Sequence, residues 1–273
     1  MRFFDSHSHL QDERFDEDRA AVLGRAAAAG VETIVVCGED VASSEAAISL
    51  AERTERPGLL ATAGFHPHEA SRATTAALSA IETLARNAGV AAIGEIGLDF
   101  YRDLSPRDVQ RRVFDAQLAI AARLGLPVTV HSRDAEEDLA PHLETFAAES
   151  PLGGEGRPLG VLHAFGGTLE QAQRHVELGF LISLTCAAGY PRNDEARRIA
   201  AGLPLSALLI ETDSPALPPQ SARGTRNEPA NVRAAAEVVA EARGIGVEAV
   251  AAATTATAEA LFAAPVPVVE APA

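Results

Sequence analysis

Short apolar runs alternate with helix-like stretches along the whole chain. Each apolar run is shorter than a typical helix, and most are rich in branched side chains, which favours β-strands. The eight predicted strands cover residues 2–5, 33–37, 59–65, 90–96, 126–130, 160–162, 180–184 and 207–210.

The stretches between these runs carry start and stop signals of helices. Three helices are predicted in this way: one from a capping box at Ser105, with Pro106 in the first helical position, to Gly125; one from Thr168 to Gly179; and one over residues 231–243 before Gly244. Strand–helix alternation over the whole length predicts a parallel α/β architecture. Eight repeats in about 250 residues match a (β/α)₈ TIM barrel better than an open sheet.

Composition is consistent with one large domain. The chain has 273 residues, of which 47% are hydrophobic and 22% charged, which is typical of a soluble globular protein. We expect a single barrel domain over residues 1–264, a surface loop over 153–158 and a frayed, proline-rich C-terminal tail over 265–273. No apolar run has the length of a membrane span, and the N-terminus shows no signal-peptide pattern, so we expect no membrane association and a cytoplasmic location. The two cysteines, Cys37 and Cys186, suggest neither a disulfide framework nor a thiolate metal site.

The charged residues exclude several mechanisms. The net charge is −15, and all 23 basic residues are arginines, because the sequence contains no lysine. Schiff-base chemistry, a P-loop lysine and a metal site bridged by a modified lysine are therefore excluded. The negative charge also argues against general binding of polyanions.

Polar side chains of the kinds that bind metals appear where the apolar runs end. They are His7 and His9 after the first run, His66 after the third, Glu95 in the fourth, His131 after the fifth, His163 after the sixth and Asp213 after the eighth. In a barrel the carboxyl ends of all strands face one rim, where active sites lie. A lone histidine at a strand end is more often a surface or capping residue, so the hypothesis depends on the convergence of the whole set.

Two metal ions fit this set better than one. His7 and His9 are two residues apart, so on a strand both point the same way. Six candidate ligands (His7, His9, Glu95, His131, His163 and Asp213) exceed what one catalytic ion needs, but fit two divalent ions about 3.5–4 Å apart that share one carboxylate. Glu95 is the expected bridge, and mixed nitrogen and oxygen ligands leave Mg²⁺, Mn²⁺ and Zn²⁺ open. Of the other histidines, we expect His68 to line the rim and His142 and His175 to be solvated on helices.

The motifs together resemble the TatD family of metal-dependent hydrolases over nearly the whole chain. They are Asp5-Ser6-His7-Ser8-His9-Leu10, Gly64-Phe65-His66-Pro67-His68, Gly94-Glu95-Ile96-Gly97-Leu98-Asp99-Phe100, His131-Ser132-Arg133, His163-Ala164-Phe165-Gly166-Gly167 and Glu211-Thr212-Asp213-Ser214-Pro215. The resemblance implies a two-metal phosphodiesterase, commonly a DNase, and we expect a 3'-5' exonuclease. It also implies one ion on His7, His9 and Asp213, another on His131 and His163, Glu95 between them, and His66 in contact with substrate.

Two positions depart from the family pattern. Gly166 replaces a serine or threonine, which removes a hydroxyl that could contact phosphate, although the following helix start offers backbone N–H groups. Thr257 stands where the family usually has asparagine, at a position that we interpret as structural.

For phosphodiester hydrolysis, the metal ligands Asp213 and Glu95 are the predicted catalytic residues. Asp213 would orient or deprotonate the attacking water. Arg133, and after it Arg223, are predicted to bind the phosphate, and either could instead be a surface or salt-bridging arginine. Asp99 and Glu211 either orient ligating histidines or are ordinary hydrogen-bonding groups.

Two other functions stay open at this point. The same barrel and metals could hydrolyse an amide, an ester or a lactone, because a fold does not determine a function. Alternatively, the chain could be an inactive metal-binding barrel. As partners we expect weakly bound DNA strands or ends, and we expect a monomer.

Overall fold

The predicted strands pair in chain order into a single parallel sheet. In the computed structural model, which describes residues 1–263, neighbours from β1 to β8 are hydrogen-bonded in sequence. The strands are β1 Phe3–Ser8, β2 Val31–Val36, β3 Gly58–Ala63, β4 Val90–Asp99, β5 Val128–Arg133, β6 Gly160–Leu162, β7 Phe180–Thr185 and β8 Leu208–Glu211. All eight predicted strands are thus confirmed, although β1, β4 and β5 run three residues beyond their predicted ends.

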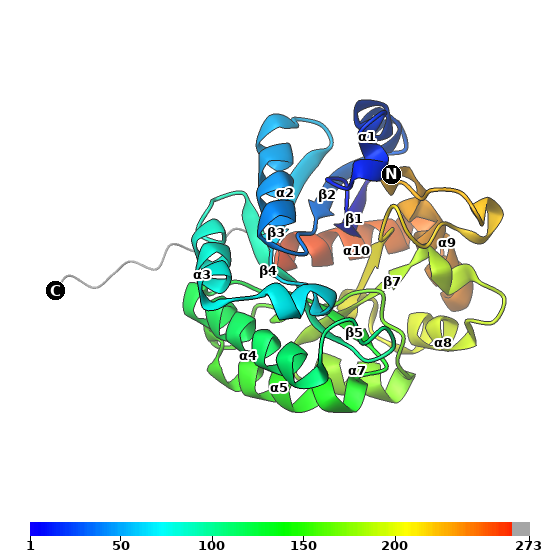
Figure 1. Ribbon diagram of the computed structural model, residues 1–273. Helices are drawn as coiled ribbons and strands as arrows, with labels where there is room; N and C mark the ends of the chain where they lie inside the picture. Colours follow the sequence, from blue (N-terminus) through cyan, green and yellow to red (C-terminus); the bar gives the residue numbers. More distant parts are fainter. Residues whose placement is uncertain (264–273) are drawn as a thin grey trace.

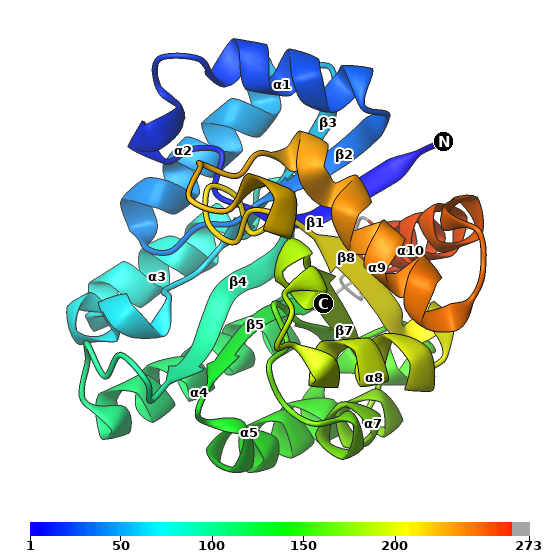
Figure 2. The same cartoon turned by 90° about the vertical axis from the view of Figure 1, so that its right-hand side faces the viewer.

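The sheet closes almost completely into a barrel. Ser8 forms an isolated parallel bridge with Ser214, and the amide of Asp213 donates to the carbonyl of His7 at 2.9 Å. The buried carboxylate of Asp5 accepts hydrogen bonds from the Thr212 amide at 2.8 Å and the Thr212 hydroxyl at 2.6 Å. The segment after β8 is therefore tied to β1, and helices surround the strands as the TIM-barrel prediction requires (Figure 2).

Helices connect the strands and cover the outside of the barrel (Figure 1). The α-helices are α1 Arg19–Ala28, α2 Val41–Arg53, α3 Thr75–Leu84, α4 Arg107–Leu124, α5 Glu136–Glu149, α6 Pro151–Gly154, α7 Leu169–Glu177, α8 Asp194–Gly202, α9 Val232–Arg243 and α10 Val247–Leu261. Short 3₁₀ helices are η1 Glu13–Phe15, η2 Pro67–Arg72, η3 Cys186–Gly189, η4 Leu205–Ala207, η5 Gln220–Ala222 and η6 Pro229–Asn231. No helix in residues 1–263 is long and apolar enough to cross a membrane.

Most of the predicted helix ends are confirmed. Gly125 and Gly244 end α4 and α9 in the left-handed conformation, at φ 62° and 65°. Thr168 and Gln171 form a reciprocal capping box at the start of α7.

The predicted capping box at Ser105 is wrong. Pro106 is the N-cap of α4 and makes no side-chain cap bond. The Ser105 hydroxyl instead donates to the His68 carbonyl at 2.9 Å and accepts from the Ser71 amide at 3.0 Å, so it ties together the segments after β3 and β4. The expected loop over residues 153–158 is in part wrong too, because α6 extends into it. The expected tail from Pro265 lies outside the described residues.

The apolar filling of the barrel lies near the beginning of the strands. Phe4, Val161 and Leu181, each the second residue of its strand, belong to one buried cluster. The Phe4 ring stacks on Phe262, just after α10, with centroids 5.8 Å apart. Since this end is packed with apolar side chains, the polar residues of the barrel are gathered at the carboxyl end.

Candidate metal centre

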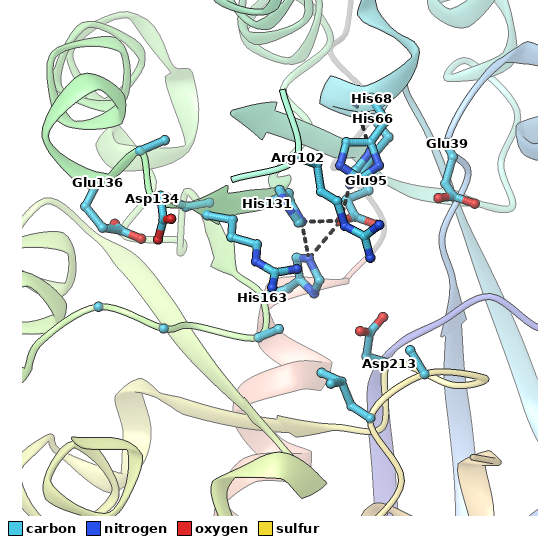
Figure 3. Close-up of a pocket in the computed structure, with 18 of the residues that line it drawn as sticks. Glu39, His66, His68, Glu95, Arg102, His131, Asp134, Glu136, His163 and Asp213 are labelled. Carbon is cyan, nitrogen blue, oxygen red and sulfur yellow. Dashed lines mark hydrogen bonds and ion pairs between the residues drawn. The ribbon is translucent and has the colours of Figure 1, made fainter. Parts of the chain in front are cut away.

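The barrel brings all six predicted ligands to one rim. His7 lies on β1, His9 directly after it, Glu95 on β4, His131 on β5, His163 directly after β6 and Asp213 two residues after β8. His7 and His131 lie inside β1 and β5 rather than after them, because backbone pairing continues past the apolar run: Gly97 of β4, for example, pairs with His131 of β5. Figure 3 shows Glu95, His131 and His163 pointing toward one another, with Asp213 across from them.

The carboxylate of Glu95 lies between two groups of imidazoles. Its Oε2 atom is 3.1 Å from His7 Nε2 and 3.4 Å from His9 Nε2. Its Oε1 atom is 2.8 Å from His163 Nε2 and 2.9 Å from His131 Nδ1. Each oxygen of the one carboxylate therefore faces a different pair of histidines.

Asp213 completes the first of these groups. Its Oδ1 atom is 3.6 Å from His9 Nε2 and 3.9 Å from His7 Nε2. The residue has a φ of 54°, a left-handed conformation that aspartate tolerates better than most residues. The hydrogen bond from its amide to the His7 carbonyl holds it there.

The donor atoms fit divalent cations. His7 Nε2 and His9 Nε2 are 3.2 Å apart, and so are His131 Nδ1 and His163 Nε2. Nitrogens so close, beside a buried carboxylate, form the donor set that a cation such as zinc or manganese requires. Within residues 1–263, three sets of three side chains offer ligand atoms that lie within 4.8 Å of one another: His7, His9 and Glu95; His66, Glu95 and His131; and His7, His163 and Glu211. These His and Glu groups are therefore able to bind metal.

The charges of the group stabilise ionised carboxylates. Burial alone would raise the pKa of Glu95, but His163, His66 and His7 outweigh it and hold the pKa well below its usual range. Burial also raises the pKa of Asp213, but His9 and the other imidazoles outweigh this effect, so the pKa of Asp213 is lowered as well. Both carboxylates are consequently ionised and can bind cations.

Two further carboxylates lie near the ring nitrogens of His131 and His163 that do not face Glu95. Asp99 Oδ2 is 3.1 Å from His131 Nε2 and 2.9 Å from His68 Nε2. Glu211 accepts from the Ala164 amide at 2.6 Å and lies 3.5 Å from His163 Nδ1. Such partners orient ligating imidazoles, which is the first of the two roles that the sequence left open.

Asp5 is a supporting residue that the sequence interpretation did not identify. Its carboxylate is fully buried and bonded to Thr212, next to Asp213. A charged residue in the middle of an otherwise buried strand was the available signal, because such a group must find partners inside the fold.

The metal centre lies in an open cleft of about 1130 Å³. His66 is almost fully buried in its wall, and burial lowers its pKa to about 4. Because His66 Nδ1 accepts from the His68 amide, a neutral His66 carries its proton on Nε2, which is 3.3 Å from Glu95 Oε1.

Of the two predicted phosphate-binding arginines, the structure brings one to the cleft. Arg133 lines it, and so does Arg102, which the sequence interpretation overlooked. Arg223 stacks on Tyr190 at 4.2 Å and is not among the residues that line the cleft.

The other histidines divide differently from the expectation. His68 lines the cleft, as predicted. His175 is only 4% exposed and is packed beside Phe165, so its expected solvation is wrong. His142 is bonded to Asp115 on the outer helices.

The structure also shows the surroundings of the two residues that depart from the family pattern. Gly166 lines the cleft, and a Cβ atom there would meet nothing within 4 Å, so a hydroxyl side chain would have room. Thr257 lies on α10, where its hydroxyl donates to the Ala253 carbonyl at 2.9 Å.

Comparisons with known proteins show the family of this chain. Residues 4–263 match the model of the family described as TatD related DNase. The chain is 38% identical to the "Uncharacterized metal-dependent hydrolase YabD" of Bacillus subtilis, over 95% of this chain and 98% of that protein. It is also 38% identical to the "3'-5' ssDNA/RNA exonuclease TatD" of Salmonella typhimurium, with the same coverage.

A solved structure gives the same result. The TatD homologue YjjV of Escherichia coli superimposes with a TM-score of 0.88 at 35% identity, over 97% of this chain and 99% of that one. From the fold, the rim and these relatives, we conclude that the chain belongs to the TatD-related DNase family.

Proposed function

We propose that this protein is a divalent-metal-dependent phosphodiesterase that shortens DNA or RNA strands from the 3' end, with DNA as the expected substrate. The observation that carries the proposal is the position of Glu95, whose two oxygens face separate pairs of imidazoles. The named activity of the Salmonella relative, at 38% identity over almost the whole chain, supports the choice of substrate class.

Two ions are the proposed cofactor. One would be held by His7, His9 and Asp213 and the other by His131 and His163, with Glu95 shared. When bound, divalent ions supply charge that polarises phosphate oxygens and favours ionisation of a water molecule. Mg²⁺, Mn²⁺ and Zn²⁺ all suit such ligands.

Asp213 and Glu95 have different proposed tasks. The Asp213 side chain is 17% exposed, so water can reach it, and its lowered pKa keeps it ionised. It would orient the attacking water and accept its proton at a carboxylate oxygen. Glu95 is buried at 3% exposure of its side chain and would position both groups of ligands rather than exchange protons with solvent.

The phosphate would be held by side chains that donate hydrogen bonds. His66 is proposed as one, through Nε2–H, since its lowered pKa keeps the ring neutral with a single N–H group. Arg133, together with Arg102, is proposed to supply the positive charge on the cleft wall. Arg223 stays a predicted phosphate-binding residue, for a substrate that is long enough to extend beyond the cleft.

Degradation of end-labelled strands tests the function. Single- and double-stranded DNA and RNA would be incubated with metal-free protein to which Mg²⁺, Mn²⁺ or Zn²⁺ is added. We expect a ladder of products shortened from the 3' end, only when metal is present. If no phosphodiester is cleaved with any of the ions, while a panel of esters or amides is, the proposal is wrong and the other hydrolase activity is favoured.

We also infer that the protein acts as a monomer in the cytoplasm. The cytoplasmic location is supported by Cys37 and Cys186, which are both free thiols, as is usual in a reducing compartment. Light scattering coupled to size exclusion measures the mass directly, and a stable dimer would contradict the inference.

A further inference from the structure

The loop after β4 exposes an aromatic ring beside the cleft. Tyr101 is 60% exposed, whereas Phe100 before it is buried. Large apolar side chains are rarely exposed in residues 1–263: they are Met1, Tyr101, Leu104 and Ile245. Two of these four lie on this one short loop, at the same rim as the metal centre.

An arginine from the neighbouring strand stacks on this ring. The Arg133 guanidinium lies 4.0 Å from the centroid of Tyr101, a typical cation–π distance. Within residues 1–263, the side chains of Arg133 and Arg102 form no ion pair or hydrogen bond, whereas Arg14, which also lines the cleft, is paired with Asp12 at 2.7 Å. Stacking therefore holds Arg133 flat and leaves its donors free.

The distribution of charged side chains around the cleft favours phosphate binding near Arg102 and Arg133. Figure 3 shows Asp134 and Glu136 on one side, Glu39 on the other, and Arg102 between them near His66 and His131. Since carboxylates repel a nucleic acid backbone, the section with the two unpaired guanidinium groups is where a strand's phosphates are attracted.

We propose that Tyr101 and Arg133 form a stacking platform for an unpaired nucleobase of the strand, next to phosphates drawn in by Arg102. Aromatic rings and guanidinium planes both stack on bases, and every base offers such a face once it is unpaired. The platform rests on the proposed nuclease function and adds the residues that make it selective for strands with accessible bases. A duplex hides the faces of its bases and would not use the platform.

Binding of short single strands to metal-free protein tests the platform without turnover. Fluorescence anisotropy at low salt would compare labelled oligo(dT) with a strand of equal length that carries abasic sites in place of bases. We expect wild-type protein to bind oligo(dT) about 10-fold more tightly than the abasic strand, within the range of base–aromatic stacking. Equal affinity for the two strands, or no measurable binding of oligo(dT), would overturn the proposal.

Variants assign the preference to the two residues. Tyr101→Ala is expected to lose the preference for bases, and Tyr101→Phe to keep it, because the ring remains.

Arg133→Lys retains the charge but not the planar group, so it is expected to lose most of the preference. A full preference in this variant would mean that Arg133 acts by charge alone and would refute its place in the platform. Leu104→Ala is the matched control, since Leu104 is 63% exposed on the same loop; a loss of preference equal to that of Tyr101→Ala would refute the specific role of the tyrosine.

Kinetics of the metal-loaded protein provide a second measurement. Tyr101→Ala is expected to raise KM for single strands about 10-fold and to affect the hydrolysis of methyl p-nitrophenyl phosphate much less, whereas Leu104→Ala should leave both activities unchanged. An equal loss on the small diester, which has no base, would speak against stacking. If the wild-type protein prefers strands with bases but hydrolyses no strand, the proposed nuclease activity is refuted and the platform is not.

Discussion

At the scale of single residues, the account depends on the carboxylate of Glu95. It is fully buried, and only the imidazoles around it compensate for the loss of water. A neutral group of the same shape would keep the packing but lose the attraction for cations on both sides. The charge and the shape of this side chain are thus separable by experiment.

Glu95→Gln is expected to lower kcat/KM on oligonucleotides by at least about 100-fold, because one removed charge weakens both groups of ligands. Metal content measured by mass spectrometry is expected to fall from two ions per chain to fewer. Glu241→Gln, an exposed change on α9, serves as the control and should behave as wild type. Full activity of Glu95→Gln with unchanged metal content would contradict the assignment.

The cysteines provide a test of burial that is independent of function. Cys37 and Cys186 are both buried, and burial raises the pKa of Cys186 to about 12. Because only the thiolate reacts, about one Cys186 in 10⁴ is reactive at pH 8, and neither thiol should be labelled by a disulfide reagent until the protein unfolds. Rapid, stoichiometric labelling of native protein would mean that these segments are more open than described.

At the scale of the elements, the ends of β4 and β5 approach each other more closely than side chains normally allow. Gly97 has a φ of 142°, and a Cβ atom there would be 1.9 Å from the carbonyl oxygen of His131. The missing side chain lets the strand that carries Glu95 pair with the strand that carries His131. The backbone, and not only the ligands, therefore determines the distance between the two groups.

Gly97→Ala is consequently expected to destabilise the fold by more than about 2 kcal/mol and to reduce metal binding, since the His131 backbone must move. Gly24→Ala is its matched control: Gly24 lies in the exposed interior of α1, and a Cβ atom there would meet nothing. That variant should gain about 0.5–1 kcal/mol. Denaturant unfolding of both variants measures the difference, and equal stabilities would contradict the account of Gly97.

The sequence predicted the elements well where local patterns determine them. The apolar runs located all eight strands, and glycines located the ends of α4 and α9. The role of Ser105 was wrong because its partners, His68 and Ser71, come from another segment that only the folded chain brings near. Tyr101 and Arg102 were not predicted for the same reason: their role depends on Arg133 of the next strand and on the absence of a pairing carboxylate within residues 1–263, and neither of these appears in a local pattern.

At the scale of the whole molecule, the net charge of −15 is balanced locally rather than overall. Many arginines are paired on the surface, such as Arg25 with Glu228 at 2.6 Å, and so do not attract a strand. At the rim, divalent ions would add positive charge where several carboxylates and imidazoles face each other. Binding of nucleic acid is therefore expected to be weak and confined to the cleft.

Metal removal should lower the stability of the whole barrel, because the ligands come from β1, β4, β5 and the segments after β6 and β8. An ion present at 100 times its dissociation constant stabilises the folded state by about 2.7 kcal/mol. We expect a chelator to lower Tm by several degrees in wild type and by less in Glu95→Gln. A melting temperature that does not respond to chelator or added metal would contradict a centre that joins these strands.

The dependence of activity on metal stoichiometry tests the central claim most directly. Metal-free protein at a concentration well above the dissociation constants would be titrated with Mn²⁺ while the hydrolysis of single-stranded DNA is followed. We predict that activity reaches its plateau at two ions per chain and that wild-type protein binds both through Glu95, so that Glu95→Gln shows no such plateau. A plateau at one ion per chain, or cleavage that needs no metal, would contradict the two-metal phosphodiesterase.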